Sequence, residues 1–287
     1  MNLEPIHPEF GARVCGFDLS QSLDDATFAQ IDEAINRYSL LLFENQQMND
    51  ERQLDFTRRF GQLEEEHTSY YSWGEITYIG TVGNIDEQGN KVSERQVKAS
   101  TGNEMWHSDS SFREIPAMYS ILMAYEVPDE AGETEFSSAR SAYQRLDAET
   151  RELIEGRVGI HDYIYSRTKV GEDAVNQGQR SYMHPVRQHL VRQNPVTGER
   201  NFFVGSHVKA IEGMPDGEAR PLIARLIDEV TRPESRYRHR WCVGDFVMWD
   251  NRCLLHCGCG YDAEKYRRRM HQTRVRGEMP SIAEPLD

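Results

Sequence analysis

The feature that most constrains the fold is a succession of short strand-like segments bounded by Gly, Asp and Pro residues. The segments cover residues 39–43, 77–82, 119–127, 201–204, 237–241 and 246–249. The first is a continuous apolar run that suits a buried strand. Many short strands of this kind favour a barrel or a jelly roll. The predicted fold class is therefore mainly β, with helices packed outside the sheets.

Three segments have the apolar periodicity of helices. The first begins near Ser22, whose spacing from Asp25 resembles a capped helix start, and apolar residues then recur at helical spacing as far as Tyr38. A second helix is expected over residues 50–60, closed by a glycine, and a third over residues 218–230. The chain therefore begins as helix, strand, helix.

Length, net charge and cysteine content indicate a single cytoplasmic domain whose cysteines are free thiols. The 287 residues contain no internal repeat or linker, so we expect a single domain over residues 1–287. The net charge of -14 disfavours nucleic acid and anionic membranes as partners. We see no signal peptide and no run of roughly 20 apolar residues that would cross a membrane. Five cysteines, an odd number, indicate free thiols, and the sequence is compatible with a homo-oligomer.

A His-x-Asp pair is the strongest local chemical motif. Residues two apart in an extended segment point to the same face, so His107 and Asp109 can reach one ion. Such pairs also occur by chance, and the alternative is a surface histidine next to a carboxylate.

A second segment offers a third candidate ligand. Residues 244–255 resemble a strand that ends in a polar turn, and His256 follows directly. Two imidazoles and one carboxylate on one face of a metal leave three positions open. This arrangement suits iron(II) oxygenases, because a chelating cosubstrate and oxygen must both bind the metal. We therefore predict that His107, Asp109 and His256 are the metal ligands and the catalytic centre.

A dicarboxylate cosubstrate also needs a cation for its far carboxylate. Arginine suits this task because its planar fork binds a carboxylate through two hydrogen bonds. Arg267, Arg268 and Arg269 lie eleven to thirteen residues after His256, and one turn could return them to the metal. Taken alone, the triplet is better explained as a solvated edge strand.

These segments resemble the family of taurine and 2,4-dichlorophenoxyacetate dioxygenases, which use iron(II) and 2-oxoglutarate. The resemblance covers nearly the whole chain, from residues 2–60 to a segment that ends near Gly277. The 2,4-dichlorophenoxyacetate branch is the closer one, on residues 105–112, 237–241 and 244–256. The family fold that this resemblance implies is a double-stranded β-helix, or jelly roll, with iron at its mouth.

The resemblance also implies cofactor-binding residues. Thr134 matches the position whose hydroxyl contacts the 2-oxoglutarate carboxylate, and a basic residue about eleven after the last histidine holds the same end. Counting selects Arg267, whereas the family's Arg-x-Met-His pattern selects Arg268. We prefer Arg268, because loops accept insertions more readily than motifs change. A second family arginine falls on Gln272, and Arg274 is the nearest substitute.

Supporting residues are expected around these groups. Trp106, Trp249 and Asn251 are placed to orient the ligands, although the tryptophans could equally be core residues. His207 is a candidate pocket residue. A loop carrying basic residues could cover the pocket and attract an anion, namely Lys91, Arg95 and Lys98.

The implied function is a 2-oxoglutarate-dependent dioxygenase that consumes O2 and hydroxylates a small organic anion. The expected substrate is an aryloxyacetate-like carboxylate, whose hydroxylation next to the ether oxygen would release a phenol and glyoxylate. Three alternatives remain open: a taurine or alkylsulfonate dioxygenase, a zinc hydrolase, and a non-catalytic jelly-roll binding protein. Cys257 and Cys259, next to His256, could contribute to a zinc site, but no second Cys/His pair completes it.

Overall fold

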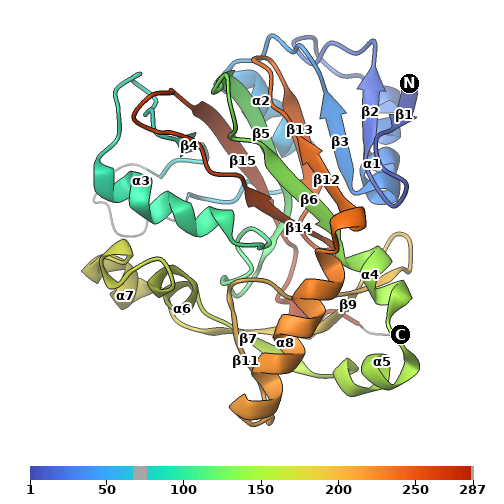
Figure 1. The fold of residues 1–287 in the computed structure, drawn as a ribbon. Helices are drawn as coiled ribbons and strands as arrows, with labels where there is room; N and C mark the ends of the chain where they lie inside the picture. The colour runs from blue at the N-terminus through green and yellow to red at the C-terminus, as the bar shows by residue number, and fades with distance from the viewer. Residues whose placement is uncertain (67–75, 286–287) are drawn as a thin grey trace.

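Two β-sheets that share a core form the centre of the structure, a computed structural model that describes residues 1–66 and 76–285 (Figure 1). Within these residues the larger sheet has seven strands and the facing sheet has three. Helices cover the outside. This is the architecture of a jelly roll, so the predicted fold class is confirmed.

The larger sheet pairs its strands antiparallel, except for the parallel contact between its second and third strands. In spatial order it contains β1 (Asn2–Pro5), β2 (Ala12–Cys15), β3 (Leu40–Phe43), β13 (Phe246–Asp250), β5 (Ala117–Glu126), β15 (Arg269–Arg276) and β4 (Gly80–Gly83). The smaller sheet contains β12 (Arg236–His239), β6 (Thr134–Ser138) and β14 (Leu254–Gly258).

The remaining described strands form two small sheets in the lower half of Figure 1. One contains β11 (Val208–Ile211), β7 (Val158–His161) and β8 (Val186–His189), and the other contains β10 (Arg200–Phe202) and β9 (Val191–Gln193).

The described helices fall into two long ones and six shorter ones. They are α1 (Asp25–Tyr38), α2 (Asp50–Arg58), α3 (Glu94–Ser100), α4 (Ala139–Arg145), α5 (Ala148–Ile154), α6 (Tyr163–Thr168), α7 (Gln177–Tyr182) and α8 (Asp216–Val230). Short 3-10 turns form η2 (Thr101–Glu104), η3 (Glu172–Ala174), η4 (Pro233–Ser235) and η5 (Ser281–Ala283). No helix among the described residues is long and apolar enough to span a membrane.

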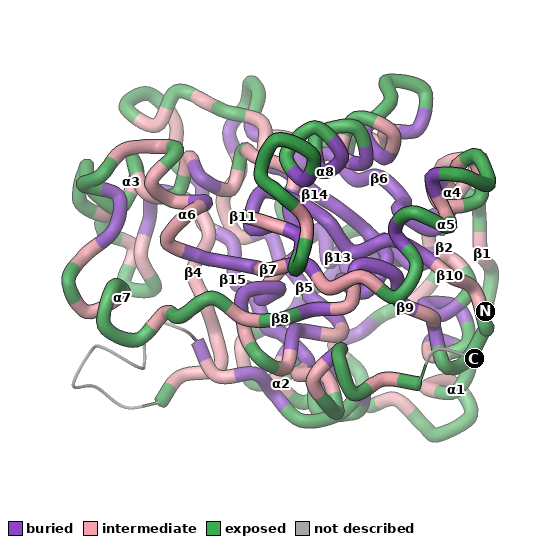
Figure 2. The backbone as a smooth tube through the Cα atoms, turned by 90° about the horizontal axis from the view of Figure 1, so that it is seen from below, coloured by how far each residue is buried: buried purple, intermediate pink, exposed green. Residues whose placement is uncertain are grey.

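The central strands are apolar on both faces because both faces are covered. In β3, Leu41 and Phe43 pack in a cluster with α1 and α2, whereas Leu40 and Leu42 pack in the cluster between the two sheets. This is the side-chain alternation of a strand. Figure 2 shows the buried backbone of β13 and β14 at the centre of the molecule. The continuous apolar run over residues 39–43 is thereby explained.

Most of the predicted elements are confirmed, and one cap is wrong. The expected helices correspond to α1, α2 and α8, and the expected strands correspond to β3, β4, β5, β10, β12 and β13. The N-cap of α1 is Asp24, whose carboxylate accepts a hydrogen bond from the Thr27 backbone N–H, and not Ser22. An aspartate one residue before the helix competes better for the free N–H groups than a serine three residues before it.

A buried arginine fixes the turn between β13 and β14, which leads to His256. The Arg252 guanidinium donates two hydrogen bonds to the Asp250 carboxylate, at 2.9 and 2.7 Å, and a third to the Tyr119 hydroxyl at 3.1 Å. Burial lowers the pKa of Arg252, but the charge and hydrogen bonds of Asp250 together with Tyr119 outweigh burial and raise the pKa above its ordinary value. Arg252 therefore stays charged inside the core.

We predict that Arg252→Met lowers the free energy of unfolding by about 3 to 5 kcal/mol, because it leaves the buried Asp250 carboxylate without its partner. The matched control is Arg220→Met, which removes an exposed ion pair with Asp216 and should cost at most about 0.5 kcal/mol. Urea unfolding followed by circular dichroism measures both. Equal losses in the two variants would show that the buried pair does not hold this turn.

Candidate metal centre and active site

Two strands of backbone bring the candidate histidines together. His107 follows η2, and its segment forms an isolated antiparallel bridge with His256 of β14, with both backbone hydrogen bonds at 2.9 Å. Residues paired across antiparallel backbone present their side chains to the same face. Gly205 lets a third segment approach, because a Cβ there would lie 3.2 Å from the Cα of His107.

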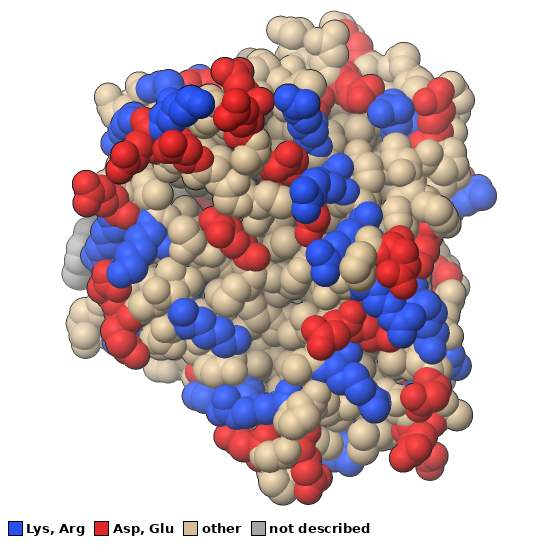
Figure 3. All heavy atoms as spheres, viewed as in Figure 1, with Lys and Arg blue, Asp and Glu red and all other residues tan. Residues whose placement is uncertain are grey.

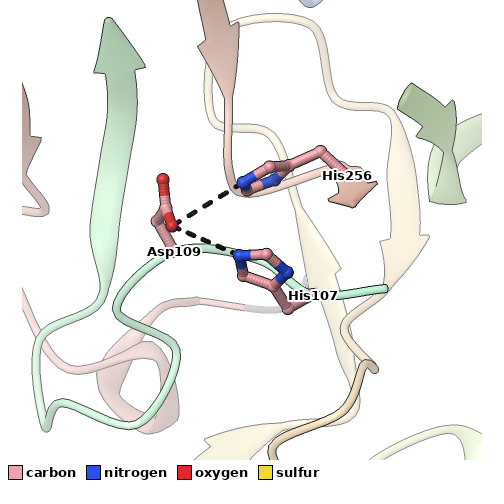
Figure 4. Close-up of side chains that lie close together, drawn as sticks. All are labelled: His107, Asp109 and His256. Atoms are coloured by element: carbon pink, nitrogen blue, oxygen red, sulfur yellow. Dashed lines mark ion pairs between the residues drawn. The ribbon is translucent and has the colours of Figure 1, made fainter. Parts of the chain in front are cut away.

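Asp109 completes the group. Its Oδ1 lies 3.6 Å from Nε2 of His107 and 3.7 Å from Nε2 of His256, and the three side chains point toward one another (Figure 4). Their ligand atoms all lie within 4.8 Å of one another. Among the described residues this is the one group of at least three candidate ligands that converges in this way.

Contacts around the histidines leave their ligand atoms available. Nδ1 of His107 bonds the Met105 carbonyl at 2.7 Å, which makes Nδ1 the protonated nitrogen and leaves Nε2 as an electron-pair donor. The His256 ring packs against the rings of Phe136 and Trp249. Burial, together with the nearby His107, lowers the pKa of His256 to about 3. His256 is therefore neutral at pH 7, as a metal ligand must be.

The second oxygen of Asp109 is already engaged. Oδ2 accepts hydrogen bonds from the Ser120 hydroxyl at 2.7 Å and from the Gln272 side-chain amide at 2.8 Å. Burial raises the pKa of Asp109, but His256, His107 and nearby Arg274 lower it by more, to well below its ordinary value. The carboxylate is thus ionised and offers one free oxygen to the metal.

Asn251 and Trp249 support the ligands as predicted, but Trp106 does not contact them through any hydrogen bond. The Asn251 side-chain oxygen accepts from the Asp109 backbone N–H and from Trp249 Nε1, both at 3.1 Å. Its amide also donates to Ser120 at 2.8 Å. Trp106 instead packs against a separate apolar cluster, with Arg236 over its ring.

Sequence reasoning missed a buried charged network beside Asp109. Arg274 donates to Glu64 at 2.7 Å, to Glu66, and to the Gln272 side-chain oxygen at 2.6 Å. Burial lowers the pKa of Arg274, but Glu66 and Glu64 outweigh burial and raise it above its usual range. Arg274 is therefore charged and already neutralised by two carboxylates.

Ser110 and Ser120 were also missed. Ser110 has a left-handed backbone, with φ of 54°, directly after Asp109, and its hydroxyl donates to Glu64 at 2.5 Å. Such a conformation is uncommon for a residue with a side chain and is found at functional sites. Ser120 had a detectable signature, since it is a small polar residue inside an otherwise apolar strand segment.

Thr134 lies on the same face as His256, farther along the smaller sheet. His256 is paired with Phe136 of β6, and Thr134 is two residues away from Phe136 and paired with Gly258. Two residues along a strand span about 7 Å. The Thr134 oxygen accepts a hydrogen bond from Trp241 Nε1 at 2.9 Å, so its own proton can be donated to a ligand.

Arg267 and Arg268 have opposite environments. Arg267 is exposed and pairs with Glu126, at 2.6 Å. Arg268 is buried, its Nε has no acceptor, and no carboxylate contacts it in the described part of the chain. Burial lowers its pKa to about 10, although Tyr261 and Cys259 oppose the shift. Arg268 therefore remains a charged, buried guanidinium group at pH 7 that lacks an anion.

A pocket opens beside His107 and Asp109. Its walls include the aromatic group of Phe112, Tyr163 and His207, together with Arg167, Gln272, Arg274 and Glu66. His207 thus lies in the pocket as expected, and its ring meets that of His107 edge to face at 6.0 Å. Burial, with help from Arg167, holds the pKa of His207 well below its ordinary value.

The basic loop does not reach this pocket. Lys98 pairs with Asp173 at 2.8 Å, Arg95 donates to the carbonyl of the same residue, and Lys91 donates to the Glu264 carbonyl. None of the three lines the pocket. The predicted role of these residues is therefore wrong, because they tie α3 and its approach to neighbouring surface segments.

The cysteines beside His256 do not form a zinc site within the described residues. Burial, with help from Glu135, raises the pKa of Cys257 to about 12, so without a metal it is a neutral thiol at pH 7. Adjacent strand residues point to opposite faces, so Cys257 points away from the site that His256 faces. Among the described residues, the converging group of candidate ligands includes neither Cys257 nor Cys259.

The donor set fits iron(II). Two neutral imidazole nitrogens and one carboxylate oxygen are the ligands of mononuclear non-haem iron oxygenases, and they leave positions for a chelating cosubstrate. The unpaired, buried Arg268 independently requires an anion, and a dicarboxylate chelator would supply one.

Comparisons with known proteins agree with this chemistry. The family model described as "Taurine catabolism dioxygenase TauD, TfdA family" matches residues 2–274. The chain is 37% identical to the alpha-ketoglutarate-dependent 2,4-dichlorophenoxyacetate dioxygenase of Cupriavidus pinatubonensis, over 94% of this chain and 96% of that protein. It is 33% identical to the (S)-phenoxypropionate/alpha-ketoglutarate-dioxygenase of Sphingobium herbicidovorans, over 98% of this chain and 96% of that protein.

A solved structure is similar throughout. The crystal structure of AAD-2 in complex with Mn(II) and N-oxalylglycine superposes with a TM-score of 0.89 and 34% sequence identity, covering 98% of this chain and 100% of that chain. The fold, the convergent His107, Asp109 and His256, and these similarities lead to one conclusion. The chain belongs to the taurine catabolism dioxygenase TauD, TfdA family, and it is an oxidoreductase that depends on iron(II) and 2-oxoglutarate.

Proposed function

We propose that this dioxygenase hydroxylates the carbon next to the ether oxygen of an aryloxyalkanoate, with His107, Asp109 and His256 as the iron ligands. The observation that carries the proposal is the convergence of these three side chains beside a pocket with a mixed aromatic and cationic wall. The names of the relatives add the substrate class, since they act on 2,4-dichlorophenoxyacetate and (S)-phenoxypropionate.

The side chains of the protein hold and orient the metal ligands and the cosubstrate. Ser120 and Gln272 occupy one oxygen of Asp109, so the carboxylate presents the other toward the histidines. We propose that 2-oxoglutarate lies along β6, with its far carboxylate between the Thr134 hydroxyl and the Arg268 guanidinium. The span of about 7 Å between the His256 and Thr134 positions suits a five-carbon dicarboxylate. Arg274 has a structural role and does not bind the cosubstrate, because Glu64 and Glu66 already neutralise it.

The metal supplies the oxidation: with iron(II) bound, O2 and 2-oxoglutarate yield succinate and carbon dioxide while one oxygen atom enters a substrate C–H bond. In an aryloxyacetate the product carries a hydroxyl and an aryl ether on one carbon. The bond between this hemiacetal carbon and the ether oxygen breaks, the hydroxyl group becomes the carbonyl of glyoxylate, and the departing phenol oxygen takes up the hydroxyl proton. The products are a phenol and glyoxylate.

We also propose that the chain acts as a single domain in the cytoplasm, without nucleic-acid or membrane partners. The net charge of -14 supports this, and basic and acidic side chains are interspersed over the face in Figure 3. A homo-oligomer is compatible with this function. Size-exclusion chromatography with light scattering measures that state.

The ligand assignment predicts that Asp109→Ala and His256→Ala each abolish substrate-dependent succinate release without unfolding the protein. The removed group binds metal rather than core, and Mn(II) affinity should fall by more than the roughly 10- to 100-fold that loss of a supporting residue costs. Calorimetric Mn(II) titration and circular dichroism measure both effects. His184→Ala, at an exposed position, is the control and should match the wild type. Wild-type turnover in either ligand variant would refute the assignment.

The cosubstrate assignment predicts that Arg268→Gln weakens 2-oxoglutarate by roughly ten- to a hundredfold, the effect of losing a charged hydrogen-bond partner. Without 2-oxoglutarate, the same variant should be at least as stable as the wild type, because an unpaired buried charge is removed. Arg267→Gln, which breaks only an exposed pair, is the control. Apparent affinity and thermal unfolding with and without 2-oxoglutarate test both statements. A larger affinity loss in Arg267→Gln would transfer the role to that residue.

The substrate class is tested by incubating enzyme, iron(II), O2 and 2-oxoglutarate with phenoxyacetate, phenoxyacetamide or taurine. We expect phenoxyacetate to give succinate and phenol in equal amounts and to exceed the other two compounds in kcat/KM by at least about tenfold, since the neutral amide lacks the charge that a cationic group recognises. If the amide reacts as well as the acid, recognition of the anion is wrong. If taurine is preferred, the substrate class is wrong and the iron chemistry is unaffected.

A further inference from the structure

Arg167 is a guanidinium group in the wall of the metal pocket. It lies on α6 and lines the same pocket as His107 and Asp109. Its guanidinium carbon lies 5.1 Å from the centre of the Tyr163 ring, and that ring stacks on His207, which in turn meets His107. Along this chain of contacts, two rings, those of Tyr163 and His207, lie between the cation and the metal ligand His107.

The hydrogen bonds of Arg167 are incomplete. Nη2 donates to the side-chain oxygen of Asn103 at 2.7 Å, but Nε and Nη1 are buried and have no acceptor among the described residues. No carboxylate pairs with Arg167 in this part of the chain. Arg167 is half-buried as a whole, but N–H groups of a cation that are shielded from water and lack acceptors are unfavourable unless a ligand supplies them.

Two residues of η2, Gly102 and Asn103, determine where the Arg167 guanidinium group lies. A Cβ on Gly102, in η2, would lie 1.9 Å from Nη1 of Arg167, so glycine lets the guanidinium group occupy this position without shifting. Asn103, the next residue, holds Nη2. The turn that leads to the metal ligand His107 thus also locates this cation.

Other cations near the pocket have other partners. Arg274, which also lines the pocket, is paired with Glu64 and Glu66. Lys98 is paired with Asp173, outside the pocket. Since the whole chain carries a charge of -14, an anionic substrate needs a local cation that is not already neutralised.

We propose that Arg167 binds the carboxylate of the substrate and thereby determines the preference for anionic substrates. The planar fork of arginine matches a carboxylate through two parallel hydrogen bonds, and the free Nε and Nη1 groups supply donors for them. The neighbouring aromatic rings of Phe112 and Tyr163 offer an apolar surface for the remainder of the substrate. This inference rests on the proposed function and names the residue that recognises the anion.

The test compares the wild type with Arg167→Met, which keeps an apolar side chain over Tyr163, and with Arg167→Lys, which keeps the charge but loses the fork. We expect Arg167→Met to raise KM for phenoxyacetate by roughly ten- to a hundredfold, and to remove most of the preference for phenoxyacetate over phenoxyacetamide. Arg167→Lys should recover part of the affinity. The affinity for 2-oxoglutarate, measured with Mn(II) and without oxygen, should stay within about twofold, because a different cation holds the cosubstrate.

Arg180→Met is the matched control, since it removes an exposed arginine on nearby α7 that pairs with Glu172, and it should leave KM unchanged. An unchanged KM in Arg167→Met, or an equal loss of 2-oxoglutarate affinity, overturns the proposal. If Arg167→Met does not fold, Arg167→Lys decides, and a wild-type KM in that variant overturns it. If the proposed function is wrong, the wild-type enzyme itself will prefer taurine to phenoxyacetate. The KM of Arg167→Met is then compared with that of the wild type for taurine, and an unchanged KM again overturns the role of Arg167.

Discussion

The backbone pairing of His107 with His256 is the contact on which the site depends. It joins a loop that follows η2 to a strand that lies 149 positions later in the sequence, through two hydrogen bonds of 2.9 Å. Paired residues share a face, so the pairing alone aligns two imidazoles. Asp109 lies two residues after His107, so in an extended chain its side chain points to the same face as the two imidazoles. The turn at Asp250 and Arg252 fixes where β14 begins.

Four arginines with buried guanidinium nitrogens fall into two groups, those with a carboxylate partner and those without one. Arg252 and Arg274 are buried with carboxylates and serve the architecture, since they hold the turn before β14 and the network behind Asp109. Arg268 and Arg167 have buried nitrogen atoms without acceptors and no carboxylate partner in the described residues. A protein gains nothing in stability from such groups, and their cost is offset only when an anion binds. This contrast is the reason for our proposal that Arg268 binds the cosubstrate and Arg167 binds the substrate.

The sequence alone predicted the three candidate metal ligands that converge in the structure, because local geometry determines where they lie. His107 and Asp109 lie two positions apart in an extended segment, and His256 follows a strand with a recognisable polar turn. The choice of Arg268 over Arg267 also followed from a motif, and their burial differs accordingly. The sequence could not reveal Gln272 as a partner of Asp109, the neutralisation of Arg274 by Glu64 and Glu66, or the position of Arg167. Each of these depends on contacts between segments 64 to 210 positions apart, or on which of several charged residues is buried. For the same reason, charge alone misleadingly favoured Lys91, Arg95 and Lys98.

The most direct test of the central claim is an anaerobic titration of the iron(II)-loaded protein with 2-oxoglutarate, followed by visible absorption spectroscopy. Two imidazoles and one carboxylate leave positions for the cosubstrate to chelate the metal, and chelation of iron(II) by a 2-oxo acid gives a charge-transfer band. We predict a saturable band that forms without O2 and substrate, that requires both iron(II) and 2-oxoglutarate, and that is absent with Zn(II) or after a chelator removes the metal. Succinate release should follow only when O2 and substrate are added. Saturating 2-oxoglutarate that produces no band, or turnover that persists with Zn(II) in the absence of O2, would contradict it.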